Sequence, residues 1–303
     1  GNMPQRQAAL GALSAIGKGS PEVDKELSQL DRRVANVPKI AINDAALPNL
    51  ADPDDRGAIT ELMRVMATTI TEALGPNLQA FGVTKKERID PRAGLPIRNE
   101  VAAWAGALGI GEFELYVGGS DPGAVRALAL ETPAIVVGAA VTAPLSPIHR
   151  QALARELYAL RRGTTVLGHR ESDDVAALIV AACRVGEVEL SAPSFAMLGE
   201  FQRLLAKETS GWGARQLRKV LPSLARAVAD EAPDLLGWVR AATSSLDRMA
   251  AIAAGDVSWV LGGRTRAPVG DGREERARAE RLLAFVLSPT YLDLREQLGM
   301  GVR

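Results

Sequence analysis

The chain has 303 residues, of which 47% are hydrophobic and 24% charged, so it carries enough apolar material to bury a large core. Lys plus Arg and Asp plus Glu both number 36, and this neutral balance gives no electrostatic reason to expect nucleic acid or an anionic membrane surface as a partner. The single cysteine, Cys183, excludes an intramolecular disulfide and fits a reducing, cytoplasmic compartment. The longest apolar stretch, residues 133–145, is too short for membrane insertion.

Residues 1–56 are predicted to form an N-terminal lead-in helix and a wrapping loop ahead of the main domain, residues 57–303. Residues 1–19 are small and polar, and we expect them to be frayed. Ser20 and Pro21 then fit the N-cap and first position of a short charged helix that ends near Arg33. Residues 37–58 are rich in proline and aspartate, and they predict a connection that wraps around the domain.

The main domain is predicted to be mostly helical. A helix over 57–74 has apolar residues at helical spacing and stops at Gly75-Pro76, and another helix is expected near 98–108. Alternating or continuously apolar residues indicate three short strands over 113–117, 125–130 and 134–137. Further helices are predicted over 147–162, 172–185, 194–208, 212–229, 233–253, 273–287 and 289–298. The predicted fold class is therefore α+β, with one small β-sheet.

One segment, residues 115–167, carries a resemblance to a known family. Two strands and a loop precede a helix that contains the sequence Arg155-Glu156-Leu-Tyr-Ala159. This order and spacing resemble the zinc metallopeptidase family that includes HtpX and the CAAX prenyl endopeptidases, in which the helix bears the motif His-Glu-x-x-His. The resemblance places Arg155 and Ala159 at the two histidines and Glu156 at the catalytic glutamate. It implies a zincin-like fold, with the small sheet beside this helix.

The family's third metal ligand is a glutamate on a later helix, in a Glu-x-x-x-Asp pattern. The best match is Thr243-Ser-Ser-Leu-Asp247, which the resemblance places with Thr243 at the ligand and Asp247 at the supporting aspartate. All three ligands are then replaced. Arginine offers no lone pair to a cation, because its pKa lies above about 12, and alanine and threonine offer no useful ligand there. We therefore expect no metal, no cofactor and no zinc-dependent peptide hydrolysis.

The two histidines of the chain do not replace the lost ligands. His149 and His169 are not spaced at i and i+4, and neither has a cysteine or glutamate close by in a metal-binding pattern. We expect each histidine to be solvated or to cap a helix.

Loss of the cation leaves acidic residues that need another partner, because an uncompensated buried carboxylate is costly. Arg155 is predicted to project into the former metal position and pair with Asp247 across the two helices; the alternative is that it extends into solvent. The dipeptide Asp247-Arg248 has two possible roles. Asp247 is a buried aspartate that accepts hydrogen bonds, or the two residues form an exposed pair. Glu156 points about 100° away from Arg155, and is expected to be the weaker partner, either a relic base or a solvated carboxylate.

These features favour a pseudoenzyme, a metallopeptidase-like domain that acts as a scaffold or as an interaction module for an unknown protein partner. The resemblance implies that it is part of a larger cytoplasmic bacterial protein. Two alternatives are a hydrolase with a site rebuilt around Glu156 and Asp247, and a helical binding domain unrelated to peptidases. The basic stretch 262–273 is predicted to be a solvated loop, with a phosphate site as the alternative.

Overall fold

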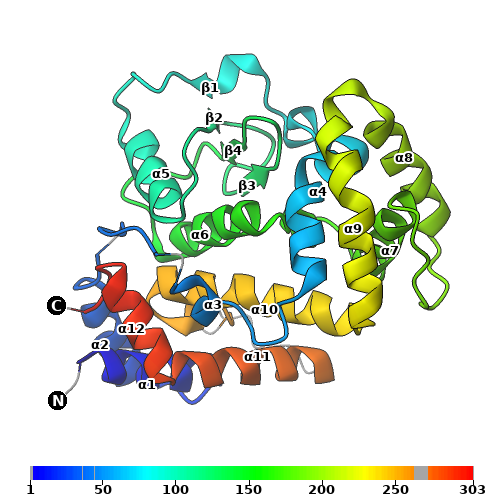
Figure 1. The fold of residues 1–303 in the computed structure, drawn as a ribbon. Helices are drawn as coiled ribbons and strands as arrows, with labels where there is room; N and C mark the ends of the chain where they lie inside the picture. The colour runs from blue at the N-terminus through cyan, green and yellow to red at the C-terminus, as the bar shows by residue number, and fades with distance from the viewer. Residues whose placement is uncertain (1–2, 36, 44, 263–271, 303) are drawn as a thin grey trace.

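The computed structural model describes residues 3–35, 37–43, 45–262 and 272–302. Within these residues the chain is mostly helical and has one small four-stranded mixed sheet, so the predicted α+β class is confirmed. Figure 1 shows the sheet at the top of the view above helix α6 (Pro147–Arg162), which lies beside the long helix α10 (Leu235–Ala254). These two helices carry all the residues that the sequence singles out as a former metal site.

The sheet has the strand order β1-β2-β4-β3. Strands β2 (Glu114–Val117), β3 (Val125–Leu128) and β4 (Ala134–Val137) correspond to the three predicted strands. Strand β4 pairs parallel with β2 and antiparallel with β3, and all four of its residues are buried, as a central strand covered on both faces requires. The sequence does not predict β1 (Arg88–Ile89), because two residues are too few to show any period.

The sheet packs against α6, as predicted, because its apolar face needs cover. Leu153 and Leu157 of α6 belong to the same buried cluster as Val125 and Ile135 of the sheet. Helix α6 ends at Gly163, which adopts a left-handed φ of 70°. A Cβ atom there would lie 2.5 Å from the Cα atom of a neighbouring helix, so only glycine allows this close packing.

Helix α10 is enclosed on nearly all sides, which its small side chains permit. Residues 249–254 are at most 1% exposed. Helices α6 and α10 are antiparallel, because Arg150 near the start of α6 donates from Nε to the carbonyl oxygen of Ala253 at 2.6 Å, whereas Arg155, further along, reaches Asp247. This register matters for the site, since it fixes which residues of the two helices face each other.

The C-terminal end of α10 is closed by two buried arginines that the sequence does not predict to be buried. Arg150 donates to the carbonyl oxygens of Ala253 and Ala254, and Arg295 donates to that of Gly255 at 3.1 Å. A helix C-terminus presents unpaired carbonyls and the negative end of the helix dipole, so cations there are stabilising. Arginine is usually exposed, which is why its burial here was not evident from sequence.

A second hydrophobic cluster lies to the right of the sheet and α6 in Figure 1. The first half of α10 contributes to it together with four further helices: α4 (Ala58–Leu74), α7 (Ser172–Val185), α8 (Leu198–Ser210) and α9 (Arg215–Glu231). Cys183 is fully buried within this cluster, and burial raises the pKa of its thiol to about 12. A thiol in that environment behaves as a small hydrophobic side chain.

The expectation that residues 1–19 are frayed is wrong, because residues 3–15 form helix α1 (Met3–Ala15). Gln7 is fully buried, its amide nitrogen donates to Asp31 at 3.0 Å, and its amide oxygen accepts from Arg295 at 2.9 Å. Ala8 joins the same cluster as the sheet and α6. The segment has no strong apolar period of its own, so contacts with distant parts of the chain order it.

The remaining helices follow the predicted order. They are α2 (Pro21–Asp31), α3 (Leu47–Leu50), α5 (Pro96–Ala107), α11 (Arg273–Val286) and α12 (Pro289–Gln297). Helix α3 is a short turn within the wrapping connection that the sequence predicts. Most of the predicted basic loop, residues 263–271, lies outside the described residues.

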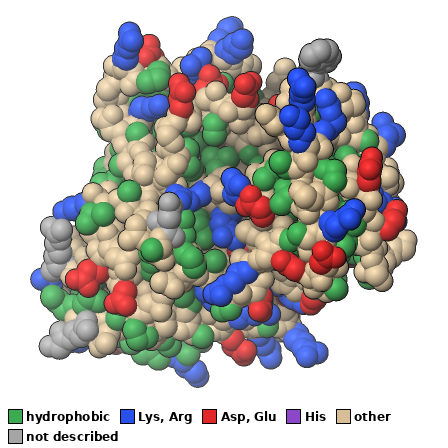
Figure 2. All heavy atoms as spheres, in the orientation of Figure 1, with side chains coloured by type: hydrophobic (Ala, Val, Ile, Leu, Met, Phe, Trp, Pro, Cys, Tyr) green, Lys and Arg blue, Asp and Glu red, His purple; other side chains and the backbone are tan. Residues whose placement is uncertain are grey.

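The surface of the molecule reflects the equal numbers of acidic and basic residues. Figure 2 shows both kinds of side chain spread over one face, with Lys and Arg gathered around a hollow near its middle. In the described part of the chain, no helix combines the length and the apolar character that a membrane crossing needs.

Candidate functional site

Arg155 and Asp247 form an ion pair across α6 and α10, through Nη1 and Oδ1. The Asp247 side chain is 1% exposed, whereas the Arg155 side chain is 26% exposed and reaches inward from the edge of the helix pair. The predicted pairing of these residues is therefore present, and the alternative that Arg155 extends freely into solvent is wrong. Of the two alternatives for Asp247, the structure shows the buried aspartate that accepts hydrogen bonds, and not the exposed pair.

A second arginine, Arg278 of α11, completes this arrangement and was not predicted. Its Nε lies 2.5 Å from Oδ2 of Asp247 and its Nη2 lies 2.9 Å from Oδ1, a two-pronged contact that occupies both carboxylate oxygens. The hydrogen bonds to Asp247 raise the pKa of the Arg278 guanidinium. Residues 273–281 hold four arginines at exposed helical positions, and nothing in the sequence distinguishes Arg278 from the others. We call Arg155, Asp247 and Arg278 the arginine clasp.

The three positions that the resemblance assigns to metal ligands have separate surroundings. Arg155 belongs to the clasp, Ala159 is 4% exposed in the core, and Thr243 lines a cleft between α10 and α11. Because α6 and α10 are antiparallel, with Arg155 opposite Asp247, the next turn of each helix brings Ala159 and Thr243 to the same level. Among the described residues, no group of three or more His, Cys, Asp or Glu is placed to hold a metal ion.

Glu156 turns away from the clasp and toward the sheet. Its carboxylate accepts a hydrogen bond of 2.9 Å from the backbone N–H of Ala127, on the edge strand β3. Burial raises the pKa of Glu156 to about 7, although this hydrogen bond and the charges of Arg126 and Arg155 act in the opposite direction. The expectation of a solvated carboxylate is wrong, because this side chain is partly buried and occupies the outward-facing amide of an edge strand.

Two further ion pairs tie the wrapping connection to the helix pair. Arg248 donates from Nη2 to Asp52 at 3.1 Å, and Arg162 lies 2.6 Å from Asp55. Both aspartates are nearly inaccessible, at 5% and 2% exposure. The sequence marks this segment as a wrapping connection but carries no signal for which arginines meet its aspartates, because the partners lie more than a hundred residues away.

The histidines lie at helix ends, not in a metal site. His149 is in the first turn of α6, where its backbone N–H donates to the hydroxyl of the N-cap residue Ser146. His169 follows a short 3-10 helix as its C-cap, and its half-buried ring faces that of Phe81 at 6.0 Å between centroids. Burial lowers the pKa of His169, so its ring favours the neutral form.

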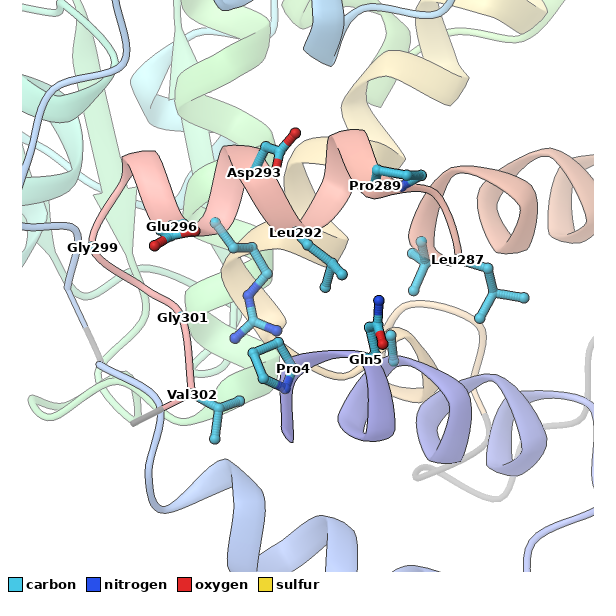
Figure 3. A pocket seen from close by; sticks show the side chains of 13 residues that line it. Pro4, Gln5, Leu287, Pro289, Leu292, Asp293, Glu296, Gly299, Gly301 and Val302 are labelled. Atoms are coloured by element: carbon cyan, nitrogen blue, oxygen red, sulfur yellow. The ribbon is translucent and has the colours of Figure 1, made fainter. Parts of the chain in front are cut away.

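A separate cavity of about 740 Å³ opens between α1, α12 and the C-terminal residues. Figure 3 shows side chains from both helices turned toward it, including Gln5 of α1 and Leu292 of α12. None of the five residues predicted for the former metal site lines it. This cavity therefore has no connection with the chemistry that the sequence suggested.

Comparison with protein-family models, with curated proteins and with solved structures finds no match for this chain.

Proposed function

We propose that the chain is a non-catalytic, metallopeptidase-like domain of the zincin type, in which the arginine clasp occupies the place of a metal ion. In this proposal the domain serves as a rigid scaffold or interaction module for a protein partner, within a larger cytoplasmic bacterial protein. The observation that carries it is the position of Asp247. Its fully buried carboxylate receives positive charge from two directions, through Arg155 of α6 and Arg278 of α11.

The pairing of the helices supports the same proposal. The clasp and the contact between Arg150 and Ala253 set α6 antiparallel to α10, and this register brings the positions of all three former ligands to neighbouring turns. Two side chains at i and i+4 on one helix, facing a third on another helix, are the arrangement that a zinc site of this kind requires. The present residues at these positions, Arg155, Ala159 and Thr243, supply no zinc ligand.

A hydrolase rebuilt around Glu156 and Asp247 is less well supported. A carboxylate with a pKa near 7 is suited to general-base catalysis, and Glu156 has that property. However, Glu156 is hydrogen-bonded to the backbone of β3, whereas both oxygens of Asp247 are held by arginines. The two carboxylates therefore serve different partners and do not act on one substrate atom.

The proposal is tested by removing the arginine and restoring the ligands. We expect the purified chain to carry no stoichiometric zinc after dialysis, as measured by elemental analysis. The variant Arg155→His/Ala159→His/Thr243→Glu should bind about one zinc ion per chain, because it rebuilds the set of two histidines and one carboxylate. The double variant without Thr243→Glu is the matched control and should bind zinc more weakly, since it lacks one ligand.

Either of two results would contradict the proposal. Stoichiometric zinc in the unaltered chain, with hydrolysis of a peptide substrate, would show an active metalloenzyme. A triple variant that keeps the helical circular dichroism of the parent but binds no more zinc than the double variant would show that these three positions do not converge as in a zincin.

A further inference from the structure

A cleft of about 560 Å³ lies between α10, α11 and the first residue of α7, and its lining is rich in arginine. Its volume falls within the range that small-molecule sites occupy. The described residues that line it are Ser172, Arg240, Thr243, Ser244, Arg273, Glu274, Ala277, Arg278 and Arg281. The cleft meets the site described above at two residues, Thr243 of α10 and the clasp residue Arg278.

The cleft is formed by matching faces of two helices. On α10 its residues are at positions 240, 243 and 244, and on α11 at positions 273, 274, 277, 278 and 281. Both sets follow the spacing of three and four residues that places side chains on one face of a helix. Arg240 of α10 and the arginines of α11 therefore line the same cleft from opposite sides. Arginines scattered at random over the surface would not be arranged in this way.

The positive charge of the cleft is only partly neutralised. Among the described lining residues, four are arginines and Glu274 is the only one with a carboxylate. Arg278 shares Asp247 with Arg155, and Arg240 lies 3.5 Å from the exposed Asp234. Within the described part of the chain, Arg281 has no carboxylate within ion-pair distance. The chain as a whole is neutral, so the excess of positive charge in the cleft comes from the positions of these arginines and not from a basic composition.

We propose that this arginine cleft binds a small ligand through a diphosphate group. Guanidinium groups form paired hydrogen bonds with phosphate oxygens, and several of them on opposite walls match an anion that carries more than one charged centre. The hydroxyls of Thr243 and Ser244 on the same face of α10 add uncharged donors beside the arginines. This inference goes beyond the scaffold function. The cleft shares Thr243 and Arg278 with the site described above, but the inference rests on the arginines of the cleft and does not require that a metal once bound there.

The experiment uses inorganic pyrophosphate as the probe and isothermal titration calorimetry of the full chain at low ionic strength. We expect saturable binding to the unaltered protein, tighter than that of orthophosphate and weakened by added salt. Arg240→Ala/Arg281→Ala should weaken pyrophosphate binding by at least about tenfold, because it removes two charge-assisted contacts. Glu274→Gln should strengthen it, because it removes the competing carboxylate.

The matched control is Arg203→Ala, which removes an exposed arginine of α8 that does not line the cleft and should leave the affinity unchanged. Arg278 is not used, because its removal would also disturb Asp247. Thermal melting of each variant checks that the fold is kept. The proposal is overturned if the unaltered protein shows no saturable binding of pyrophosphate or if Arg203→Ala weakens it as much as the double variant. Binding to anionic phospholipid vesicles without binding of pyrophosphate would equally overturn it, since the ligand would then be a membrane surface.

Discussion

Two acidic residues on the facing helices, Asp247 of α10 and Glu156 of α6, differ in how the protein accommodates them. Asp247 is almost completely inaccessible and receives hydrogen bonds from two guanidinium groups. Glu156 is partly buried and receives one hydrogen bond from a neutral backbone amide, and the pKa of its carboxyl rises to about 7. The comparison shows that burial alone does not decide the energetics of an acid; the charge of its hydrogen-bond donors does.

The largest expected effect comes from removing both arginines of the clasp. Arg155→Ala/Arg278→Ala leaves Asp247 buried without a cation and should lower the free energy of unfolding by roughly 3–5 kcal/mol. Arg155→Ala alone should lower it by about 1–2 kcal/mol, because Arg278 still occupies both carboxylate oxygens. Urea denaturation followed by circular dichroism measures each value.

A third substitution separates the effect of charge from the loss of packing. Adding Asp247→Asn to the double variant removes the stranded charge, so part of the lost stability should return. If the triple variant were as unstable as the double variant, lost side-chain packing would explain the effect and the clasp would have no electrostatic role.

The second effect concerns Glu156 and its pH dependence. Because its pKa is about 7 in the folded chain and about 4.3 in an unfolded one, the folded state holds the proton more strongly between these values. This acid therefore lowers the stability of the folded chain as the pH rises through that window. Glu156→Gln keeps an acceptor for Ala127 without a charge, so its stability relative to the parent should rise between pH 4 and pH 8, by at most about 2 kcal/mol after screening by solvent.

Urea denaturation of parent and variant at the two pH values measures this difference. Glu200→Gln, at an exposed position of α8, is the matched control and should show no such dependence. A relative stability for Glu156→Gln that stays constant from pH 4 to pH 8 would mean that Glu156 titrates normally and that its burial carries no electrostatic cost.

The smallest change in the free energy of unfolding is expected at an arginine–carboxylate ion pair on the surface. Arg64 and Glu61 of α4 form a two-pronged contact much like that between Arg278 and Asp247, but their side chains are 55% and 46% exposed. Arg64→Ala should therefore change the free energy of unfolding by less than about 0.5 kcal/mol in urea denaturation. A loss comparable to that of the clasp variants would show that pairing geometry, and not burial of the acid, determines the difference.

Much of the secondary structure follows from local sequence signals. Ser146-Pro147 and Ser288-Pro289 begin α6 and α12, and the hydroxyl of each serine accepts from the backbone amide three residues on, as the N-cap preference predicts. Strand β4 was predictable from its continuous apolar run. Helix α1 and strand β1 were not predicted. Helix α1 is held in place by contacts with distant residues, such as those of the buried Gln7. Strand β1 is too short to show a period.

The site was predictable only where charge balance gave a reason. A buried aspartate needs a positive partner, and the family resemblance placed Arg155 opposite Asp247. It gave no means of finding Arg278, since the four arginines of residues 273–281 look alike in sequence and only the rotation of α11 selects one of them for Asp247. The turn of Glu156 away from Arg155 was predicted, but its hydrogen-bond partner was missed, because that partner is a backbone amide, and every residue except proline has one.

The sequence by itself determined most of the helices, three of the four strands of the sheet and the α+β class. It also determined the absence of histidines from the i, i+4 positions of α6. These features depend on residue types and on spacing within one element. The tertiary structure alone decided which arginine meets which acid, how α11 completes the clasp, and how two ordinary helix faces form a cleft lined by arginine. Such contacts join residues far apart in the chain, as between Arg248 and Asp52, which are 196 positions apart. They depend on the relative rotation and register of packed helices, which no local pattern records.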